Sequence, residues 1–450
     1  MADRPAQKLK ALFARRADGF SHAGIAVMGV RVGAAGLALA AQVLAARLIG
    51  PDGFGSYALV MVWLVLLGHT ATVGTNQLIC RLVAAYRAQE DAPAIAGLLR
   101  FSLALAGGAA LAVSGLALGV VHFAPFGLSP EMTLLATLGL LIVPLLMVQD
   151  FLEAIARGLD KPILGIGPAM FVRHLAIISG VGVVFLTGGS ADALTIMGFT
   201  IAGVVVSVAV QYGLVRGQLR ETIGVAKPVY KVRYWTRTAL PIALLDAAET
   251  LFNNADVLIL GLFAPPEIVA FYFAATRIAQ VLGYVPYGIS AATAQKYASL
   301  AARGEQARLH QLIEYATFAS TALTSVGALV LWAGAPALLS LFGPDYTVAA
   351  GVVPILALGL VAASALGPGE DVLTMLGEER ACAMGFLVAL GVTVGLGFAL
   401  IPNWGMTGAA LATAAGLTVR GLVLSSLAWA RLGVVLPIGM ARIGKKRAVA

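Results

Sequence analysis

The chain has 450 residues, of which 60% are hydrophobic and only 12% are charged, and its mean hydropathy is +0.91. A soluble globular domain carries roughly 25% charged residues, so this composition excludes a water-soluble fold. The net charge of +8 would suit a nucleic-acid partner, but several stretches contain no charge and are each as long as the ~20 apolar residues that cross a bilayer. These stretches are residues 53–80, 101–130, 193–215, 315–344 and 381–419. We therefore expect an all-α polytopic membrane protein that does not bind nucleic acid.

Residues 1–21 form a basic segment in which Leu9, Leu12, Phe13 and Phe20 lie on one helical face and the lysines and arginines lie elsewhere. This pattern predicts a short amphipathic helix in the headgroups of the cytoplasmic leaflet. No small-residue cleavage site follows a short apolar core, so the first apolar run is expected to act as an uncleaved anchor.

Twelve membrane-spanning helices are predicted, in two lobes of six. Their ranges are 22–49, 56–80, 96–122, 132–157, 163–187, 193–214, 238–262, 269–292, 310–333, 349–368, 381–401 and 407–431. The first lobe covers residues 22–214 and the second covers 238–431. A basic cytoplasmic linker, 215–237, is expected to lie against anionic lipid, and a basic cytoplasmic tail follows at 432–450. Because each lobe has an even number of helices, we expect a pseudo-two-fold axis along the membrane normal to relate the lobes.

The basic residues predict the orientation of these helices. With the N-terminus in the cytoplasm, 23 of the 30 lysines and arginines lie in cytoplasmic segments and none lies in the six outside loops. Basic residues concentrate on the cytoplasmic side of membrane proteins, so both termini are expected there. The outside loops are all short, which counts against a membrane enzyme that holds its reaction in an external loop.

A seven-residue pattern recurs near the start of each lobe. Residues 51–57 read Pro-Asp-Gly-Phe-Gly-Ser-Tyr, and residues 266–272 read Pro-Glu-Ile-Val-Ala-Phe-Tyr. Both runs have proline, an acid, any residue, an apolar residue, a small residue, any residue and tyrosine. Their offset of 215 residues matches a repeat of six helices. Such internal repeats are typical of transporters that rock about a central site.

Two predicted helices carry a line of polar residues on one face. These residues are Asp246, Glu249, Asn253 and Asp256 on the seventh helix, and His69, Thr72 and Asn76 on the second. An ionisable residue at mid-membrane costs at least ~2.5–3.5 kcal/mol, so it usually faces a cavity or a partner. The acids of the seventh helix could therefore couple transport to a cation, or they could pair across helices and only stabilise the packing. Packing is the more common use of a lone histidine.

Single arginines lie well inside four predicted helices. They are Arg31, Arg173, Arg277 and Arg420. A guanidinium group binds phosphate oxygens through two parallel hydrogen bonds, which a lysine matches less well. Arg31 and Arg277 are favoured for such a site because they lie on helices next to the repeated pattern, one in each lobe.

No motif in the sequence indicates catalysis, a metal site or a cofactor. The nearest to a phosphate-binding loop is residues 439–445, but Lys446 replaces the Ser/Thr that would hold magnesium and no strand precedes it. Cys80 and Cys382 are expected to be reduced packing residues. Glu153 and Arg157 fit an ordinary ion pair four residues apart on the fourth helix.

The chain resembles the polysaccharide-biosynthesis (Wzx-type) flippases of the multidrug/oligosaccharidyl-lipid/polysaccharide exporter superfamily. The resemblance rests on residues 46–57, 254–261, 272–277, 341–346 and 401–413, which read ARLIGPDGFGSY, NADVLILG, YFAATR, LFGPDY and IPNWGMTGAALAT. These motifs are modest one by one, but their order and spacing span nearly the whole chain.

The resemblance implies two six-helix lobes around a V-shaped central cavity that opens alternately to either face of a bacterial inner membrane. It implies an undecaprenyl-pyrophosphate-linked oligosaccharide as cargo for O-antigen or exopolysaccharide synthesis, moved by an ion gradient without a cofactor. Membrane lipids, a polysaccharide polymerase and export proteins are the implied partners. A cavity arginine for the pyrophosphate would correspond to Arg31 or Arg277. Two alternatives stay open: a drug/sodium or drug/proton antiporter of the same superfamily, and a membrane glycan polymerase or ligase.

Overall fold

The computed structural model describes residues 22–123, 127–224 and 226–438. Every regular element in these ranges is a helix, as the composition predicts. The predicted amphipathic segment 1–21 and the stretch 439–445 lie outside the described residues.

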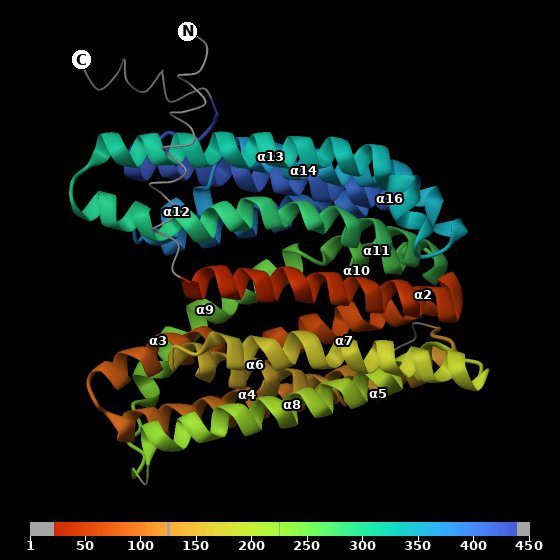
Figure 1. The fold of residues 1–450 in the computed structure, drawn as a ribbon, viewed down its shortest axis with the longest axis horizontal. Coiled ribbons are helices and arrows are strands. Elements are labelled where there is room, and N and C mark those ends of the chain that lie inside the picture. The colour runs from red at the N-terminus through yellow and green to blue at the C-terminus, as the bar shows by residue number, and fades with distance from the viewer. Residues whose placement is uncertain (1–21, 124–126, 225, 439–450) are drawn as a thin grey trace.

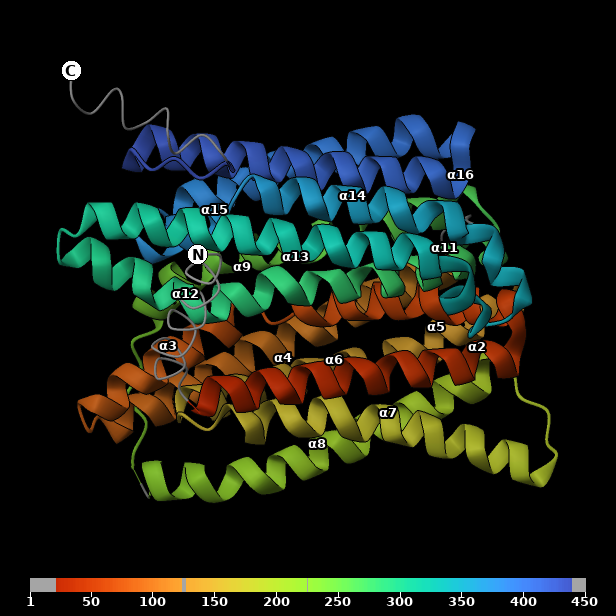
Figure 2. The same ribbon diagram turned by 45° about the horizontal axis from the view of Figure 1, so that its top comes forward.

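The helices run roughly alongside one another in two groups (Figures 1 and 2). The first half of the chain forms α2 (His22–Thr70), α3 (Thr75–Ala88), α4 (Ala92–Phe123), α5 (Pro130–Leu140), α6 (Val143–Gly158), α7 (Pro162–Thr187) and α8 (Ala193–Ile223). The second half forms α9 (Val232–Phe252), α10 (Ala255–Phe263), α11 (Pro266–Gln280), η1 (Val281–Gly283), α12 (Tyr284–Ala302), α13 (Gln306–Ser340), η2 (Pro344–Gly351), α14 (Val352–Ala365), α15 (Gly369–Met375) and α16 (Glu379–Leu432). In Figure 1, α3–α8 lie on one side, α12–α16 lie on the other, and α2 and α9–α11 lie between them.

Nine helices in the described ranges are long and apolar enough to cross a membrane. Two of them, α2 and α16, reverse direction at Gly50 and Gly405, where φ is 71° and 52°. Glycine adopts such positive φ values without the steric penalty of a Cβ. In α16, Gly416 lies against Thr393 across the reversal, so its arms run antiparallel. With both arms of α2 and α16 counted, and with α9–α10 as a further span, the structure confirms the predicted twelve-helix, two-lobe, all-α fold.

Three of the predicted spans are broken, so the prediction of continuous helices is wrong there. The second arm of α2 ends at Thr70, and Gly74, with φ of 69°, separates it from α3. The break between α5 and α6 precedes Pro144, which has no N–H to donate to the preceding turn. The break between α9 and α10 occurs where Asn254 Nδ2 donates to the Thr250 carbonyl over 2.8 Å. Asparagine side chains compete with the backbone for such hydrogen bonds.

The connection between the two halves is short because α8 extends to residue 223 and α9 begins at residue 232. It is attached to the first half: Lys231 Nζ lies 3.3 Å from Asp91 Oδ2 and 4.7 Å from the centre of the Tyr86 ring. Trp235 Nε1 donates to the Tyr86 hydroxyl over 3.1 Å. We call this end of the bundle the linker end, and the opposite end, which holds Gly50 and Gly405, the Gly50 end.

The hydrophobic core is shared at one end of the molecule and divided at the other. One buried cluster joins both halves and takes residues from the ranges 41–66, 135–146, 177–204, 255–282, 331–357 and 401–410. A second cluster contains first-half residues together with Trp235 and Ala239, and a third contains only second-half residues, between Tyr297 and Leu436. The halves therefore pack together toward the Gly50 end and have separate cores toward the linker end.

Direct contacts close the Gly50 end. The Phe54 ring of the first half lies 6.0 Å from the Phe273 ring and 6.3 Å from the Phe342 ring of the second half, between centres. Arg47 Nη2 donates over 2.9 Å to the Ser340 carbonyl at the end of α13. The last carbonyls of a helix lack intrahelical partners and carry partial negative charge, so they partly compensate the charge of this arginine where the two halves meet.

Candidate functional site

A cavity of about 530 Å³ lies between the two halves. The first half contributes walls from α2 and α7, and the second half contributes the break between α9 and α10 together with α11. Its polar lining consists of Gln42, Tyr57, Arg173, His174, Asn253, Asn254, Arg277 and Gln280. Each half therefore supplies one arginine to a shared space.

Among the described residues the two cavity arginines have no carboxylate within ion-pair distance, although Asp256, outside the cavity lining, acts electrostatically on Arg277. Arg277 lies with its guanidinium carbon 4.2 Å from the centre of the Phe273 ring, and its Nη1 donates to Gln280 Oε1 over 2.8 Å. The Nε of Arg277 is buried without a hydrogen-bond partner among the described residues. In the described part of the chain neither Arg277 nor Arg173 forms an ion pair, and no acidic residue lines the cavity. Unpaired positive charge at membrane depth is costly, so this cavity suits an anionic ligand.

Asp256 does not face the cavity, although the sequence grouped it with the other polar residues of the seventh helix. It is only 6% exposed, and its Oδ2 accepts hydrogen bonds from the Tyr272 hydroxyl over 2.6 Å and from Thr413 Oγ1 over 3.0 Å. The first half has a matching contact, in which the Tyr57 hydroxyl lies 2.8 Å from Thr200 Oγ1. Tyr57 and Tyr272 are the last residues of the two copies of the repeated pattern. Each copy therefore attaches its helix to other helices of its own half through the tyrosine hydroxyl.

The predicted polar face along residues 246–256 is therefore divided. Asn253 lines the cavity, and the break beside it turns Asp256 into the second half. Asp246 and Glu249 lie on the linker side of the break, on α9. The prediction of one continuous face is wrong because it assumed an unbroken helix through residues 253 and 254.

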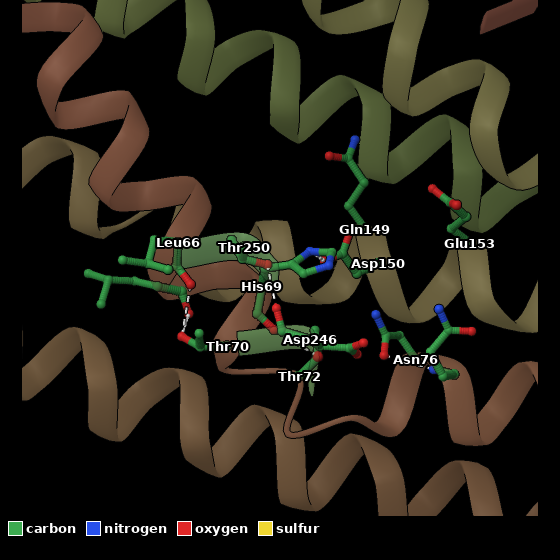
Figure 3. A network of polar contacts seen from close by, with 12 residues as sticks. Leu66, His69, Thr70, Thr72, Asn76, Gln149, Asp150, Glu153, Asp246 and Thr250 are labelled. Atoms are coloured by element: carbon green, nitrogen blue, oxygen red, sulfur yellow. Dashed lines mark hydrogen bonds and ion pairs between the residues drawn. The ribbon is translucent and has the colours of Figure 1, made fainter. Parts of the chain in front are cut away.

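Asp246 and Glu249 belong to a polar network that includes the predicted residues of the second helix. His69 Nδ1 lies 3.0 Å from Asp150 Oδ2 on α6, and Figure 3 shows the imidazole turned toward that carboxylate with Asp246 beside it. Asp246 and Glu249 both act electrostatically on His69. Asn76, on α3, is buried, and its Oδ1 accepts a hydrogen bond from the neighbouring Gln77 N–H over 2.7 Å.

Glu153 completes this network one turn beyond Asp150. The predicted pair is present at long range, with Arg157 Nη1 3.8 Å from Glu153 Oε1. Arg31 also acts electrostatically on Glu153. The network therefore contains both acids and bases, in contrast to the cavity.

Arg31 and Arg420 lie away from the residues that line the cavity. The Arg31 guanidinium is 5.3 Å from the Tyr287 ring centre, and its Nε is buried without a partner. Arg420 lies over the rings of Phe252 and Phe386, at 5.5 and 5.2 Å, and lines a separate cavity of about 390 Å³ within the second half. Of the four predicted arginines, the structure thus brings only Arg173 and Arg277 together.

Several cavity residues were not predicted, namely Gln42, His174, Asn254 and Gln280. Gln42 stands alone among apolar neighbours in its helix, which is a usable signal, whereas Asn254 comes into the cavity only through the helix break. In the ranges that the structure describes, no group of three His, Cys, Asp or Glu residues could hold a metal ion, and both cysteines are free.

Two family descriptions match the chain. The family described as "Polysaccharide biosynthesis protein" matches residues 22–294, which is more than half of the chain, and the family described as "MatE" matches residues 241–399. A comparison with curated proteins found no match.

Solved structures share the fold over most of the chain. An inward-facing multidrug resistance MATE family transporter of the MOP superfamily has a TM-score of 0.72 and 16% identity, covering 93% of this chain and 99% of that one. The lipid II flippase MurJ, in an inward closed conformation, has a TM-score of 0.72 and 12% identity, covering 93% of this chain and 90% of that one. A MOP superfamily transporter from Pyrococcus furiosus, described as having a binding pocket of reverse polarity, has a TM-score of 0.65 and 16% identity, covering 92% and 94%.

Proposed function

This chain belongs to the polysaccharide biosynthesis protein family, and we propose that it moves a lipid-linked oligosaccharide with a pyrophosphate headgroup across a bacterial inner membrane. The chain is a multi-pass membrane protein with the fold of MOP superfamily transporters. The proposed cargo is an undecaprenyl-pyrophosphate-linked oligosaccharide for O-antigen or exopolysaccharide synthesis. The surrounding lipids, a polysaccharide polymerase and export proteins are its proposed partners.

The observation that carries this proposal is the cavity between the halves, whose described lining contains Arg173 and Arg277 and no carboxylate. A pyrophosphate offers several anionic oxygens, and a guanidinium binds two of them at once. The amide side chains around the arginines, such as Gln42 and Asn253, can donate to and accept from sugar hydroxyls. The polyprenyl tail is apolar and would remain among the lipid chains of the bilayer, so the protein needs no binding site for it.

Transport would proceed by alternating access. The halves share a core at the Gly50 end and have separate cores at the linker end, so opening the Gly50 end requires this shared packing to part. An ion gradient would drive the cycle. Arg173 and Arg277 come from different halves, so a pyrophosphate between them would draw the halves together around the cargo.

Deletion of the gene is expected to abolish surface polysaccharide and to cause the lipid-linked oligosaccharide to accumulate with its sugars in the cytoplasmic leaflet. Purified full-length protein in proteoliposomes should then move a fluorescent polyprenyl-pyrophosphate oligosaccharide between leaflets, measured by quenching with an impermeant reductant. Equal flipping in empty liposomes, or normal polysaccharide in the deletion strain, would overturn the proposal.

The proposed orientation places the linker end in the cytoplasm. In a variant without Cys80 and Cys382, Gly189→Cys at the Gly50 end should react with an impermeant thiol reagent added to intact cells. Gln89→Cys at the linker end should react only after the cells are opened. Both positions are exposed. The reverse labelling pattern would require the opposite topology.

The second candidate is a drug/cation antiporter, and the match of residues 241–399 to the MatE family favours it. An antiporter for cationic drugs would need carboxylates in the substrate cavity, whereas the described lining of this cavity contains two arginines and no acidic residue. Deletion would then raise drug susceptibility and leave surface polysaccharide unchanged, which separates the two candidates.

A further inference from the structure

The polar network around His69 joins the two halves at the level where their cores divide. His69 ends the second arm of α2, its partner Asp150 is on α6, and Asp246 is on α9 of the second half (Figure 3). The side chains of His69 and Asp150 are 39% and 28% exposed. Water can therefore reach a histidine that lies between carboxylates of opposite halves.

Asp246 has an unmet hydrogen-bonding requirement. Its Oδ2 is buried and has no hydrogen-bond partner in the described structure. Leaving a buried acceptor without a donor is costly, and more so for a charged group. The charged groups that interact with Asp246 include His69, Arg157, Asp150 and Glu249, and among these His69 is the side chain whose ordinary pKa lies near neutral pH.

The charges around His69 come from every element packed against it. Asp150 and Glu153 lie on α6 with Arg157, Asp246 and Glu249 lie on α9, and Arg31 lies on the first arm of α2. Glu249 is also acted on by Glu370 and Arg420 of the second half. The neighbourhood of the histidine thus contains four acidic residues and two arginines. Because negative groups outnumber positive ones, this arrangement favours a positively charged imidazolium at His69.

We propose that His69 is the proton-binding site that couples transport to a proton gradient, with Asp150 as its anchor in the first half and Asp246 as its partner in the second. The inference rests on the proposed transport function and adds its energy source. Nδ1 donates its hydrogen to Asp150, so Nε2 is the atom that accepts a proton. The N–H bond forms as an O–H bond of hydronium breaks on one side of the membrane, and it breaks as an O–H bond to water forms on the other side.

Protonation would hold the halves together at this level. An imidazolium donates from both ring nitrogens and attracts Asp150 and Asp246 at the same time. A neutral ring leaves two carboxylates facing each other across the interface, which repel. The arrangement seen here would therefore gain population as the pH falls through the pKa of His69 and lose it as the pH rises.

Spin labels at Gln89→Cys and Arg303→Cys, one at the linker end of each half, report this equilibrium without any substrate. In full-length protein in nanodiscs, the distance distribution should shift between about pH 8 and pH 6, the range that brackets an ordinary histidine. His69→Gln should remove the shift, and Asp246→Asn should reduce it, because an amide can pair with the neutral ring. His122→Gln is the matched control, since His122 lies on α4 against Thr137, far from the network.

Proton-driven cargo movement should fall about tenfold or more in His69→Gln, within the usual range of coupling between sites. A pH-dependent shift that survives in both His69→Gln and Asp246→Asn would overturn the inference and leave the proposed cargo untouched. A shift that depends on His69 in a protein that moves no lipid-linked oligosaccharide would instead overturn the proposed cargo alone.

Discussion

Replacing Arg277 by alanine is expected to abolish cargo movement while the protein remains folded in the membrane. Arg277 lines the shared cavity, its guanidinium contacts Phe273 and Gln280, and it forms no ion pair with the described residues, although Asp256 acts on it electrostatically. A hydrogen bond to a charged group contributes about 1.5–3 kcal/mol. Loss of a two-bond contact with a pyrophosphate should therefore weaken binding by about 100-fold or more.

The measurement is flipping by the variant in proteoliposomes, alongside surface polysaccharide in cells and the amount of protein in the membrane. Arg277→Lys keeps the positive charge but cannot bind two phosphate oxygens through parallel hydrogen bonds, so it should retain partial activity. Arg308→Ala, which removes an exposed arginine paired with Glu305, should behave as wild type. Wild-type flipping by both Arg277→Ala and Arg173→Ala would exclude this cavity as the pyrophosphate site. Arg31→Ala should have a smaller effect because Arg31 does not line the cavity.

Replacing Gly55 by alanine should open the Gly50 end and stop the transport cycle. A Cβ at this position would overlap the backbone carbonyl of Pro266 in the second half. Backbone cannot rotate away as a flexible side chain can, so the halves must separate. Overpacking typically costs 1–3 kcal/mol, which corresponds to a shift of about fivefold to 150-fold in a two-state equilibrium.

Gly53→Ala is the matched control, because among the described residues its Cβ would meet the side chain of Ile49, at 3.4 Å and in the same half of the molecule. Spin labels at Gly189→Cys and Thr347→Cys, both exposed at the Gly50 end, should report a longer distance in Gly55→Ala than in Gly53→Ala. Equal distances and equal transport in the two variants would show that the close approach of Gly55 and Pro266 does not limit opening.

The number and course of the helices could be predicted from the sequence because bilayer thickness demands long apolar runs. The runs at 101–130 and 193–215, for example, lie within α4 and α8 and their immediate flanks. The breaks were harder to predict. Asn253 was predicted as one more polar residue on a helical face, and the interruption becomes visible only in the hydrogen bond from the Asn254 side chain to the Thr250 carbonyl.

The site was only partly predictable, since hydropathy identifies buried charges without their partners. Arg173 and Arg277 were both identified, but nothing in a one-dimensional pattern shows that they share a cavity while Arg31 and Arg420 do not. Asp256 was expected to line a cavity, and its true partners, Tyr272 and Thr413, lie 16 and 157 residues away. Such pairings are produced by tertiary packing.

The sharp reversals at Gly50 and Gly405 have a consequence for how the protein enters the membrane. Each joins two apolar helices with almost no intervening chain. One arm therefore cannot cross the bilayer while the other stays outside it in water. The paired helices must insert together as a hairpin, with the peptide groups of both arms already hydrogen-bonded. A longer or bulkier residue in place of either glycine should therefore lower the yield of inserted protein before it affects any later step.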